Sequence, residues 1–244
     1  MQVILRFYGE LNDFLSPEQR RKAFAHPLLL SASVKDVIES LGVPHTEVDL
    51  ILVNTAPVGF RYRVRTGDYI SVYPAFTSVD VLSLLRLRAP LNDIRFVVDT
   101  HLGRLATYLR MLGFDALYET SCDDQELSRI SARETRILLT RDLGLLRRGE
   151  VNYGYFVRAT EPRRQLREVL RRFHLFHSAA PFERCLRCNA QLRPIAKESI
   201  LDRLPPRTAE CYHEFQICPA CGRLYWPGSH YEHMRRLLEH VLAA

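Results

Sequence analysis

Apolar and polar positions over the first 80 residues follow a pattern that predicts a small mixed domain. Residues 3–9 (VILRFYG) alternate as a strand does, and Ser33 can cap the helix that follows it. Further extended segments are predicted at 50–54 and 69–74, the second of them after a turn. Strands on both sides of one helix predict a β-grasp sheet over residues 1–80.

This segment resembles the ubiquitin-like sulfur-carrier superfamily in three places. They are the opening VILRFYG, LVNTAPV at 52–58 and GDYISVYPAF at 67–76. Sulfur carriers end in a free Gly-Gly tail that becomes adenylated, whereas this chain runs on through Phe76 and Val79. We therefore expect the domain to have a binding or packing role, which includes recruiting a protein partner, rather than carrier chemistry.

The next part of the chain alternates apolar strands with amphipathic helices. Residues 81–93 are expected to form a linker, and residues 94–176 to form one domain. Its strands are predicted as apolar runs at 94–99, 114–119, 136–140 and 153–157, and its helices at 101–113, from 123 and at 161–173. This alternation predicts an α/β fold with a parallel sheet covered by helices on both faces.

Cysteine spacing defines the last domain, which is expected to span residues 182–244 and to end in a helix over 229–242. C-L-R-C and C-P-A-C-G are separated by 29 residues. Two such pairs can complete a closed tetrahedral zinc site with Zn–S bonds of about 2.3 Å, which is structural rather than catalytic. A redox pair or chance spacing is the other interpretation. The expected zinc ligands are Cys185, Cys188, Cys218 and Cys221.

Composition and charge narrow the class of protein. The chain has 244 residues, is 47% hydrophobic and 25% charged, and shows no export signal or long apolar run. We therefore expect a cytoplasmic globular protein that does not bind membranes. The net charge is +6, with arginines concentrated between 141 and 172, which favours an anionic partner such as RNA, including tRNA. A solvated basic helix face is an equally supported interpretation. The expected contacts to RNA in this stretch include Arg163, Arg164 and Arg167.

Aspartates stand at the ends of two predicted strands. Asp99 closes the first strand, Asp142 follows the third, and Asp123 or Asp124 opens a helix that starts at the same edge. Because ligands bind outside the carboxyl ends of parallel strands, these carboxylates are expected to suit Mg²⁺ or Mn²⁺. Such ions serve phosphoryl transfer. Helix capping is the alternative, and for any one of these aspartates alone it is the favoured interpretation.

Three segments together resemble one nuclease family. FVVDTHLGRLATYLRMLGFDALYE (96–119), DDQEL (123–127) and RILLTRDLGLL (136–146) are similar to the PIN-like ribonuclease domain first named from the C-terminus of the nematode mutator-seven protein. The resemblance covers roughly 94–227, and the family is known for a ubiquitin-like domain placed in front. It implies metal-dependent RNA cleavage with Asp99, Asp124 and Asp142 as catalytic acids and magnesium or manganese ligands. By the same resemblance Arg104, Arg110 and Arg141 would contact phosphate, and Thr140 would orient a water.

One position departs from the wider PIN pattern, which often has a fourth acid after a later strand. Here Val157 is followed by Arg158, Ala159 and Thr160, and the next acid is Glu161. The first hypothesis is therefore a metal-dependent ribonuclease that works with three acids. The second is an RNA- or tRNA-binding protein without catalysis, and the third is a scaffold whose β-grasp domain recruits a partner.

Overall fold

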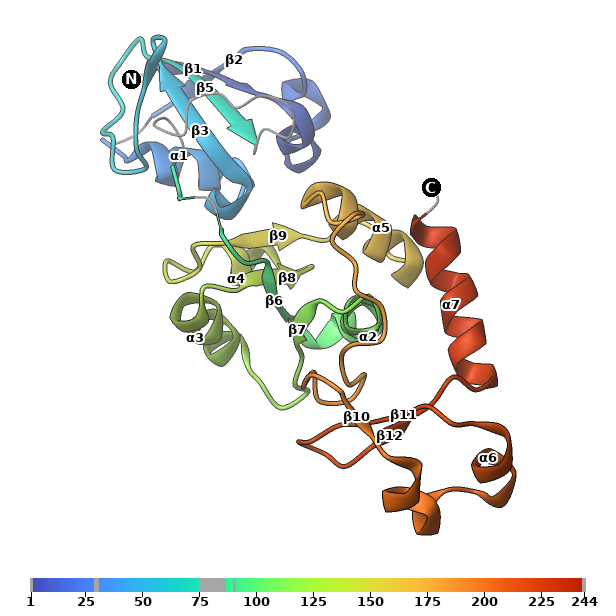
Figure 1. Cartoon of the computed structure of the whole chain (residues 1–244). Helices are drawn as coiled ribbons and strands as arrows, with labels where there is room; N and C mark the ends of the chain where they lie inside the picture. The colour runs from blue at the N-terminus through green and yellow to red at the C-terminus, as the bar shows by residue number, and fades with distance from the viewer. Residues whose placement is uncertain (1, 29–30, 75–86, 90, 243–244) are drawn as a thin grey trace. The chain divides into compact units, whose positions relative to one another are not determined.

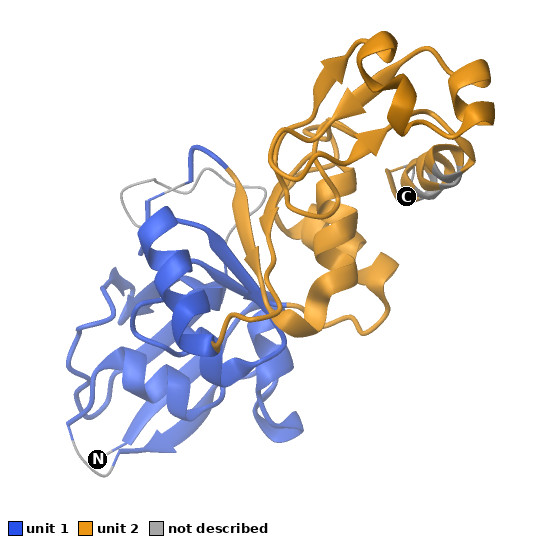
Figure 2. Cartoon of the chain, turned by 90° about the horizontal axis from the view of Figure 1, so that it is seen from below, with its two compact units in different colours: residues 1–93, 124–156 blue, residues 94–123, 157–244 orange. Residues whose placement is uncertain are grey.

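The computed structural model describes residues 2–28, 31–74, 87–89 and 91–242 (Figure 1). Contacts divide the chain into two compact units, which Figure 2 distinguishes by colour. Unit 1 comprises residues 1–93 and 124–156, and unit 2 comprises residues 94–123 and 157–244. Most of the predicted linker at 81–93 lies outside the described residues. Within the described part, no helix combines the length and the apolar character needed to cross a membrane.

A five-stranded mixed sheet forms the N-terminal part of unit 1. Strands β1 and β5 pair in parallel, and the other neighbouring strands pair antiparallel, in the order β2-β1-β5-β3-β4. This sheet with its helix α1 confirms the predicted β-grasp domain. The elements are β1 (Gln2–Phe7), η1 (Gly9–Phe14), η2 (Pro17–Gln19), β2 (Phe24–Pro27), α1 (Val34–Ser40), η3 (His45–Glu47), β3 (Val48–Val53), β4 (Ala56–Pro57) and β5 (Tyr69–Pro74).

Local sequence explains why these elements form. Alternate residues of β1 are buried, so Val3, Leu5 and Phe7 enter the core while the residues between them face outward. Ser33 caps α1 through a capping box in which its side chain accepts the Asp36 N–H and the Asp36 carboxylate accepts the Ser33 N–H. Both features agree with the sequence prediction.

The second part of unit 1 is a βαβ segment preceded by a helix. Helix α3 (Asp124–Glu134) leads to β8 (Ile137–Thr140), and α4 (Leu143–Leu146) connects β8 to β9 (Gly154–Phe156). The two strands pair in parallel, and every residue of β8 is buried, as a continuous apolar run predicts.

Unit 1 is held together where η3 meets β9. The Glu47 side chain is fully buried, and its Oε1 accepts the backbone N–H of Phe156 at 2.6 Å. His45 Nε2 lies 2.9 Å from the carbonyl oxygen of Val151. A Cβ atom on Gly154 would lie 3.3 Å from the Thr46 Cβ and 2.6 Å from Leu146 Cδ2, so the lack of a side chain at this position favours the close approach. The β-grasp domain therefore covers the backbone of β9 rather than hanging from a tether.

The described part of the predicted linker is bound to the same place. The Arg88 guanidinium donates to the carbonyl oxygens of His45, Val48 and Asn152. The Tyr153 hydroxyl donates to the carbonyl oxygen of Ala89 at 2.8 Å. These bonds join both parts of unit 1, so residues 87–89 act as a strap.

Unit 2 begins with a second βαβ segment. Strand β6 (Arg95–Val98) pairs in parallel with β7 (Asp115–Leu117), and η5 (Thr100–Leu102) and α2 (Gly103–Met111) connect them. Helix α5 (Pro162–Arg172) packs on α2. The predicted apolar face of α2 is buried throughout, and it consists of Leu102, Leu105, Ala106, Leu109 and Leu112. With the βαβ segment of unit 1, this confirms the predicted α/β class.

The ribbon that completes unit 2 is a three-stranded antiparallel sheet in the order β10-β11-β12. A small core of Ile200, Leu204 and Phe215 lies beside it. Its elements are β10 (Arg193–Ile195), η6 (Lys197–Arg203), α6 (Pro206–Cys211), β11 (Phe215–Ile217) and β12 (Leu224–Tyr225), followed by α7 (Ser229–Leu242). The closing helix has the bounds that its sequence pattern predicted.

We expect Glu47→Ala to destabilise unit 1 by about 1–3 kcal/mol, because it removes a buried carboxylate that accepts the part-buried Phe156 N–H. Urea unfolding would measure the loss, and amide exchange at Phe156 would localise it. Glu18→Ala removes an exposed carboxylate of the same domain and is the matched control. Equal effects of the two variants would contradict a specific role for Glu47.

Candidate zinc and nuclease sites

Four cysteine sulfurs meet in the ribbon as the sequence predicted. All four lie within 4.8 Å of one another, with Cys185 Sγ 3.6 Å from Cys221 Sγ and Cys188 Sγ 3.3 Å from Cys218 Sγ. Sulfurs in a tetrahedral zinc site with bonds of about 2.3 Å are about 3.8 Å apart. The donor set and its spacing therefore fit one zinc ion with no open coordination position.

Both C-x-x-C turns have the same backbone form. Cys185 donates its N–H to the carbonyl oxygen of Ala190, and Cys218 donates to that of Arg223. The residue after the second cysteine takes a left-handed conformation in each turn, with φ of +70° at both Asn189 and Gly222. Glycine and asparagine are the residues that tolerate this region best, so the sequence at these positions suits the turn.

Hydrogen bonds favour one thiolate even before metal binds. Burial alone would raise the pKa of Cys185, but the Tyr225 hydroxyl and nearby backbone N–H groups donate to its sulfur and lower the pKa to about 6. Burial raises the pKa of Cys188 to about 12. Cys188 is thus a protonated thiol near neutral pH unless a cation binds. Full deprotonation of all four cysteines requires a cation such as the zinc ion of a structural site.

The first cysteine turn is fastened to strand β7 by side chains that the sequence analysis did not identify. Asn189 Oδ1 accepts the backbone N–H of Ala116 at 3.0 Å, and its Nδ2 donates to Asp115 Oδ1 at 2.7 Å. Arg184 donates to the carbonyl oxygens of Gly113 and Asn189. One sequence signal was available. Asn189 follows the first C-x-x-C pair at the position where Gly222 follows the second, and its side chain can make hydrogen bonds that glycine cannot.

Arg110 lies at the centre of this attachment, which corrects the prediction that it contacts phosphate. Its side chain is buried, with 3% of the residue exposed. The guanidinium donates to the carbonyl oxygens of Ala116, Leu186 and Arg187 at 2.8–3.1 Å. These bonds use the guanidinium N–H groups that would otherwise donate to a phosphate. Because the acceptors belong to β7 and to the first cysteine turn, Arg110 holds the turn against the strand.

Asp99 follows β6 directly, as predicted, and is largely buried with 5% of the residue exposed. The Thr100 hydroxyl donates to its Oδ1 at 3.1 Å. Its carbonyl oxygen accepts the Leu102 N–H, which starts the short helix η5. The residue therefore sits at a strand end in a rigid backbone turn.

Asp142 caps helix α4, as the alternative interpretation of the sequence proposed. Its Oδ1 accepts the N–H groups of Gly144 and Leu145. Its own N–H donates to the hydroxyl of the buried Thr140 at 2.9 Å. Within the described part of the chain, Oδ2 has no hydrogen-bond partner, and the residue is exposed. Capping therefore uses one oxygen and leaves the other open to solvent.

Asp124 is the first residue of α3 and is exposed. Its carbonyl oxygen accepts from the Ser128 hydroxyl, while no described residue binds its carboxylate. Among the residues that the structure describes, the four cysteines are the group of possible metal ligands whose ligand atoms all lie within 4.8 Å of one another. The three aspartates are not part of such a group.

The acids that follow β9 are both engaged by backbone. Glu161 caps α5 by accepting the N–H groups of Arg163 and Arg164, and these bonds lower the pKa of its carboxyl. Glu168 accepts the N–H groups of Arg158 and Ala159 at 2.8 Å each. These contacts give both residues a structural role in the turn before α5.

Arginines cover the outer face of α5. Its opposite face buries Leu166, Val169 and Leu170, so the polar side is turned to solvent. Among the described residues no carboxylate pairs with the side chains of Arg163, Arg164 or Arg171, which are exposed. Arg104 on α2 and Arg141 before α4 are exposed too. These positions are accessible to an anion, unlike that of Arg110.

We expect Cys218→Ser to lose zinc and unfold the ribbon, because structural zinc sites supply about 10–16 kcal/mol of binding free energy to folding. Metal analysis of the purified chain and thermal unfolding would test this. The exposed Cys211 lies outside the site, so Cys211→Ser is the control and should keep its zinc. Full zinc content in the Cys218 variant would contradict the four-thiolate assignment.

Replacing Arg110 should cost stability even when charge is kept. We expect Arg110→Lys to destabilise unit 2 by about 1–3 kcal/mol, because an ammonium cannot reproduce the planar set of bonds to separate carbonyl oxygens. Arg104→Lys, an exposed change on the same helix, should alter the unfolding free energy by less than about 0.5 kcal/mol. An Arg110 variant as stable as its control would show that these bonds are dispensable.

Two protein-family models match this chain. Residues 94–238 match the Mut7-C RNAse domain, and residues 1–80 match the Mut7-C ubiquitin domain. No curated protein and no solved structure was found to match the chain. The first match includes the three predicted aspartates and the four cysteines and covers more than half of the sequence. The chain therefore belongs to the Mut7-C RNAse family and carries the ubiquitin-like domain of that family in front.

Proposed function

We propose that the protein is a divalent-cation-dependent ribonuclease with Asp99, Asp124 and Asp142 as its acidic residues. One observation carries the proposal. Within a region that matches an RNAse domain, Asp99 directly follows β6 and Asp142 follows β8 by two residues. The carboxyl ends of parallel strands are where ligands bind in α/β folds.

The surroundings of each acid support this chemistry. Asp142 Oδ2 and the Asp124 carboxylate, which no described residue binds, are hard oxygen ligands of the kind that Mg²⁺ and Mn²⁺ prefer. When bound, such a cation polarises the phosphodiester and activates the attacking water. The Thr140 hydroxyl fixes the backbone of Asp142, and the Thr100 hydroxyl orients Asp99.

The RNA backbone would be held by the exposed arginines. Arg163 and Arg164 are exposed on α5 and Arg104 is exposed on α2, while Arg167 on α5 is half-buried. Guanidinium groups bind phosphate oxygens in a planar bidentate way, so they position the strand without reading its sequence. Arg110 is not among them, since its guanidinium binds carbonyl oxygens within the protein.

A second candidate is an RNA-binding protein that does not cut. The observation that favours it is the engagement of Glu161 and Glu168, because neither is available as the fourth acid of the wider PIN pattern. In that case the protein would bind the RNA backbone through the arginines of α5 and α2 and would not cleave it.

We expect Asp142→Asn to reduce metal-dependent cleavage of a labelled structured RNA by at least about 100-fold, because it removes a negative charge from the site that would bind the cation. Asparagine also caps helices, so α4 should persist and the unfolding free energy should change little. Asp99→Asn should have the same effect, since its amide oxygen can still accept from Thr100.

The control is Glu150→Gln, which removes an exposed carboxylate from the loop before β9. Cleavage would be compared with Mn²⁺, with Mg²⁺ and without either ion. Wild-type products that require metal and vanish only in the aspartate variants would support the nuclease. RNA binding without products in any protein would select the second candidate instead.

A further inference from the structure

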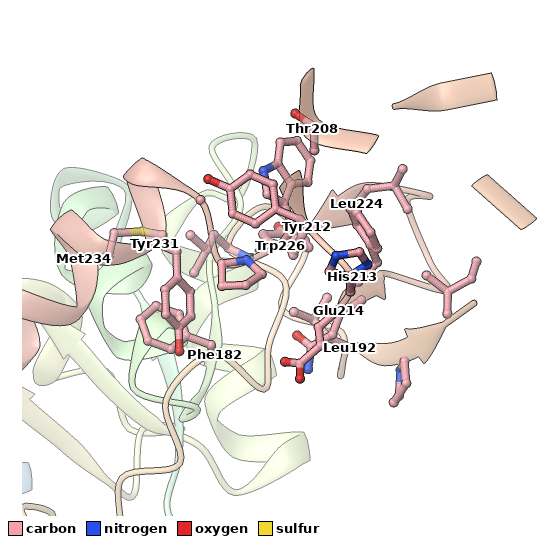
Figure 3. Close-up of a pocket in the computed structure, with 18 of the residues that line it drawn as sticks. Phe182, Leu192, Thr208, Tyr212, His213, Glu214, Leu224, Trp226, Tyr231 and Met234 are labelled. Atoms are coloured by element: carbon pink, nitrogen blue, oxygen red, sulfur yellow. Dashed lines mark hydrogen bonds between the residues drawn. The ribbon is translucent and has the colours of Figure 1, made fainter. Parts of the chain in front are cut away.

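A cleft lies within unit 2, between the ribbon and the first turns of α7. Its volume is about 1180 Å³, larger than most sites for small molecules. Phe182, Tyr231 and Met234 lie on one side and His213 and Leu224 on the other, with Tyr212 and Trp226 between them (Figure 3). A space of this size suits a segment of polymer.

Aromatic side chains line the cleft in unusual number. Tyr212 and Trp226 pack against the ribbon core, to which Phe215 belongs, and the Tyr225 hydroxyl contacts Cys185 Sγ. Besides Phe215 and Tyr225, four aromatic side chains line the cleft, and each of them is only partly buried. They are Phe182, Tyr212, Trp226 and Tyr231.

The rings are placed on separate elements that frame the space. Phe182 precedes the first cysteine turn and its ring centroid lies 4.2 Å from that of Tyr231 on α7. Trp226 directly follows β12, with its ring 6.4 Å from Phe215. The cleft therefore has an aromatic wall on the α7 side and an aromatic cap formed by Trp226 and Tyr212.

Polar groups stand between the rings. Arg207, Thr208, His213 and Glu214 line the cleft, and within the described chain no carboxylate pairs with Arg207. Flat apolar faces with hydrogen-bonding groups at their edges match nucleobases, which stack on aromatic rings and present polar edges.

Charge favours a nucleic acid over a peptide. Unit 2 has 18 lysine and arginine residues against 13 aspartate and glutamate residues, so its net charge is +5 with neutral thiols and +3 with four thiolates on one Zn²⁺. Helix α7, which lines the cleft, also packs against the arginine-rich α5. An RNA strand whose phosphates are held by α5 would therefore find the aromatic cleft, on which its bases can stack, in the same unit.

We propose that this cleft binds unpaired bases of single-stranded RNA by stacking them on Phe182, Tyr212, Trp226 and Tyr231. The inference rests on the proposed function for its choice of RNA, but it assigns a separate base-binding site on the ribbon and α7. It predicts that the protein prefers single-stranded over fully paired RNA.

Trp226 is the single tryptophan of the chain, so its fluorescence reports on the cleft directly. The zinc-loaded full chain would be titrated, without Mg²⁺ or Mn²⁺, with oligouridylate, with an RNA duplex of equal length and with inorganic polyphosphate. We expect oligouridylate to quench the emission, because a stacked base contacts the indole. Polyphosphate, which has charge but no bases, should not quench it.

Variants separate stacking from charge. Tyr231→Ala and Tyr212→Ala should each weaken oligouridylate binding by roughly tenfold, as expected for the loss of one stacked base. Tyr69→Ala removes an exposed ring of the β-grasp sheet and should leave binding unchanged. Zinc content and thermal unfolding of each variant would confirm that the ribbon is intact.

The outcomes distinguish this inference from the nuclease. Metal-dependent cleavage with no quenching, or with both cleft variants binding oligouridylate as the wild type does, would overturn the cleft and leave the nuclease standing. Quenching that depends on Tyr212 and Tyr231 without any cleavage would support the cleft and remove the catalysis. A peptide rich in aromatic residues would be the fourth titrant, and quenching by this peptide but by no RNA would overturn the inference in favour of a protein ligand.

Discussion

Four sulfur atoms gathered within 4.8 Å are the constraint on which the C-terminal half of the protein depends. The ribbon's own core is small, with three buried apolar residues, so it gains little stability from burial alone. A metal ion bound by both cysteine pairs would supply the stability that the core lacks. The sheet of the ribbon and its aromatic cleft then follow from the position of these two turns.

Arg110 and Asn189 connect the first cysteine turn to the α/β region of unit 2. Both side chains satisfy backbone groups of β7 and of the first cysteine turn, so the turn is bonded to that strand. A buried guanidinium is costly unless its donors are all engaged, and here the carbonyl oxygens meet that need. The cysteine turn and β7 thus stabilise each other.

Elements with a local pattern could be predicted from the sequence, and contacts made at long range could not. The buried face of α2 and the bounds of α7 follow from apolar spacing, and the zinc site follows from cysteine spacing. Arg110 lies in a motif that suggests phosphate binding, yet its partners Leu186 and Arg187 are more than 70 residues further on. No periodicity within the helix identifies such partners.

The same limit applies to Glu47 and to the aromatic cleft. Glu47 is a charged residue in a short turn, and its burial depends on a backbone group of Phe156, 109 residues away. The cleft combines Phe182, the ribbon and α7, each of which has an ordinary sequence. Asp99 and Asp142 are the opposite case, because their positions after β6 and β8 could be predicted from the apolar runs that precede them.

The bond between Glu47 and Phe156 also bears on how the protein can be divided. A truncated chain starting at residue 94 would keep the whole RNAse match but would lose Glu47 and the Arg88 strap. The backbone of β9 would then be an uncovered strand edge, which invites pairing with other chains. Poor solubility of such a fragment would thus reflect the loss of a covering domain and would say little about whether its nuclease fold is intrinsically unstable.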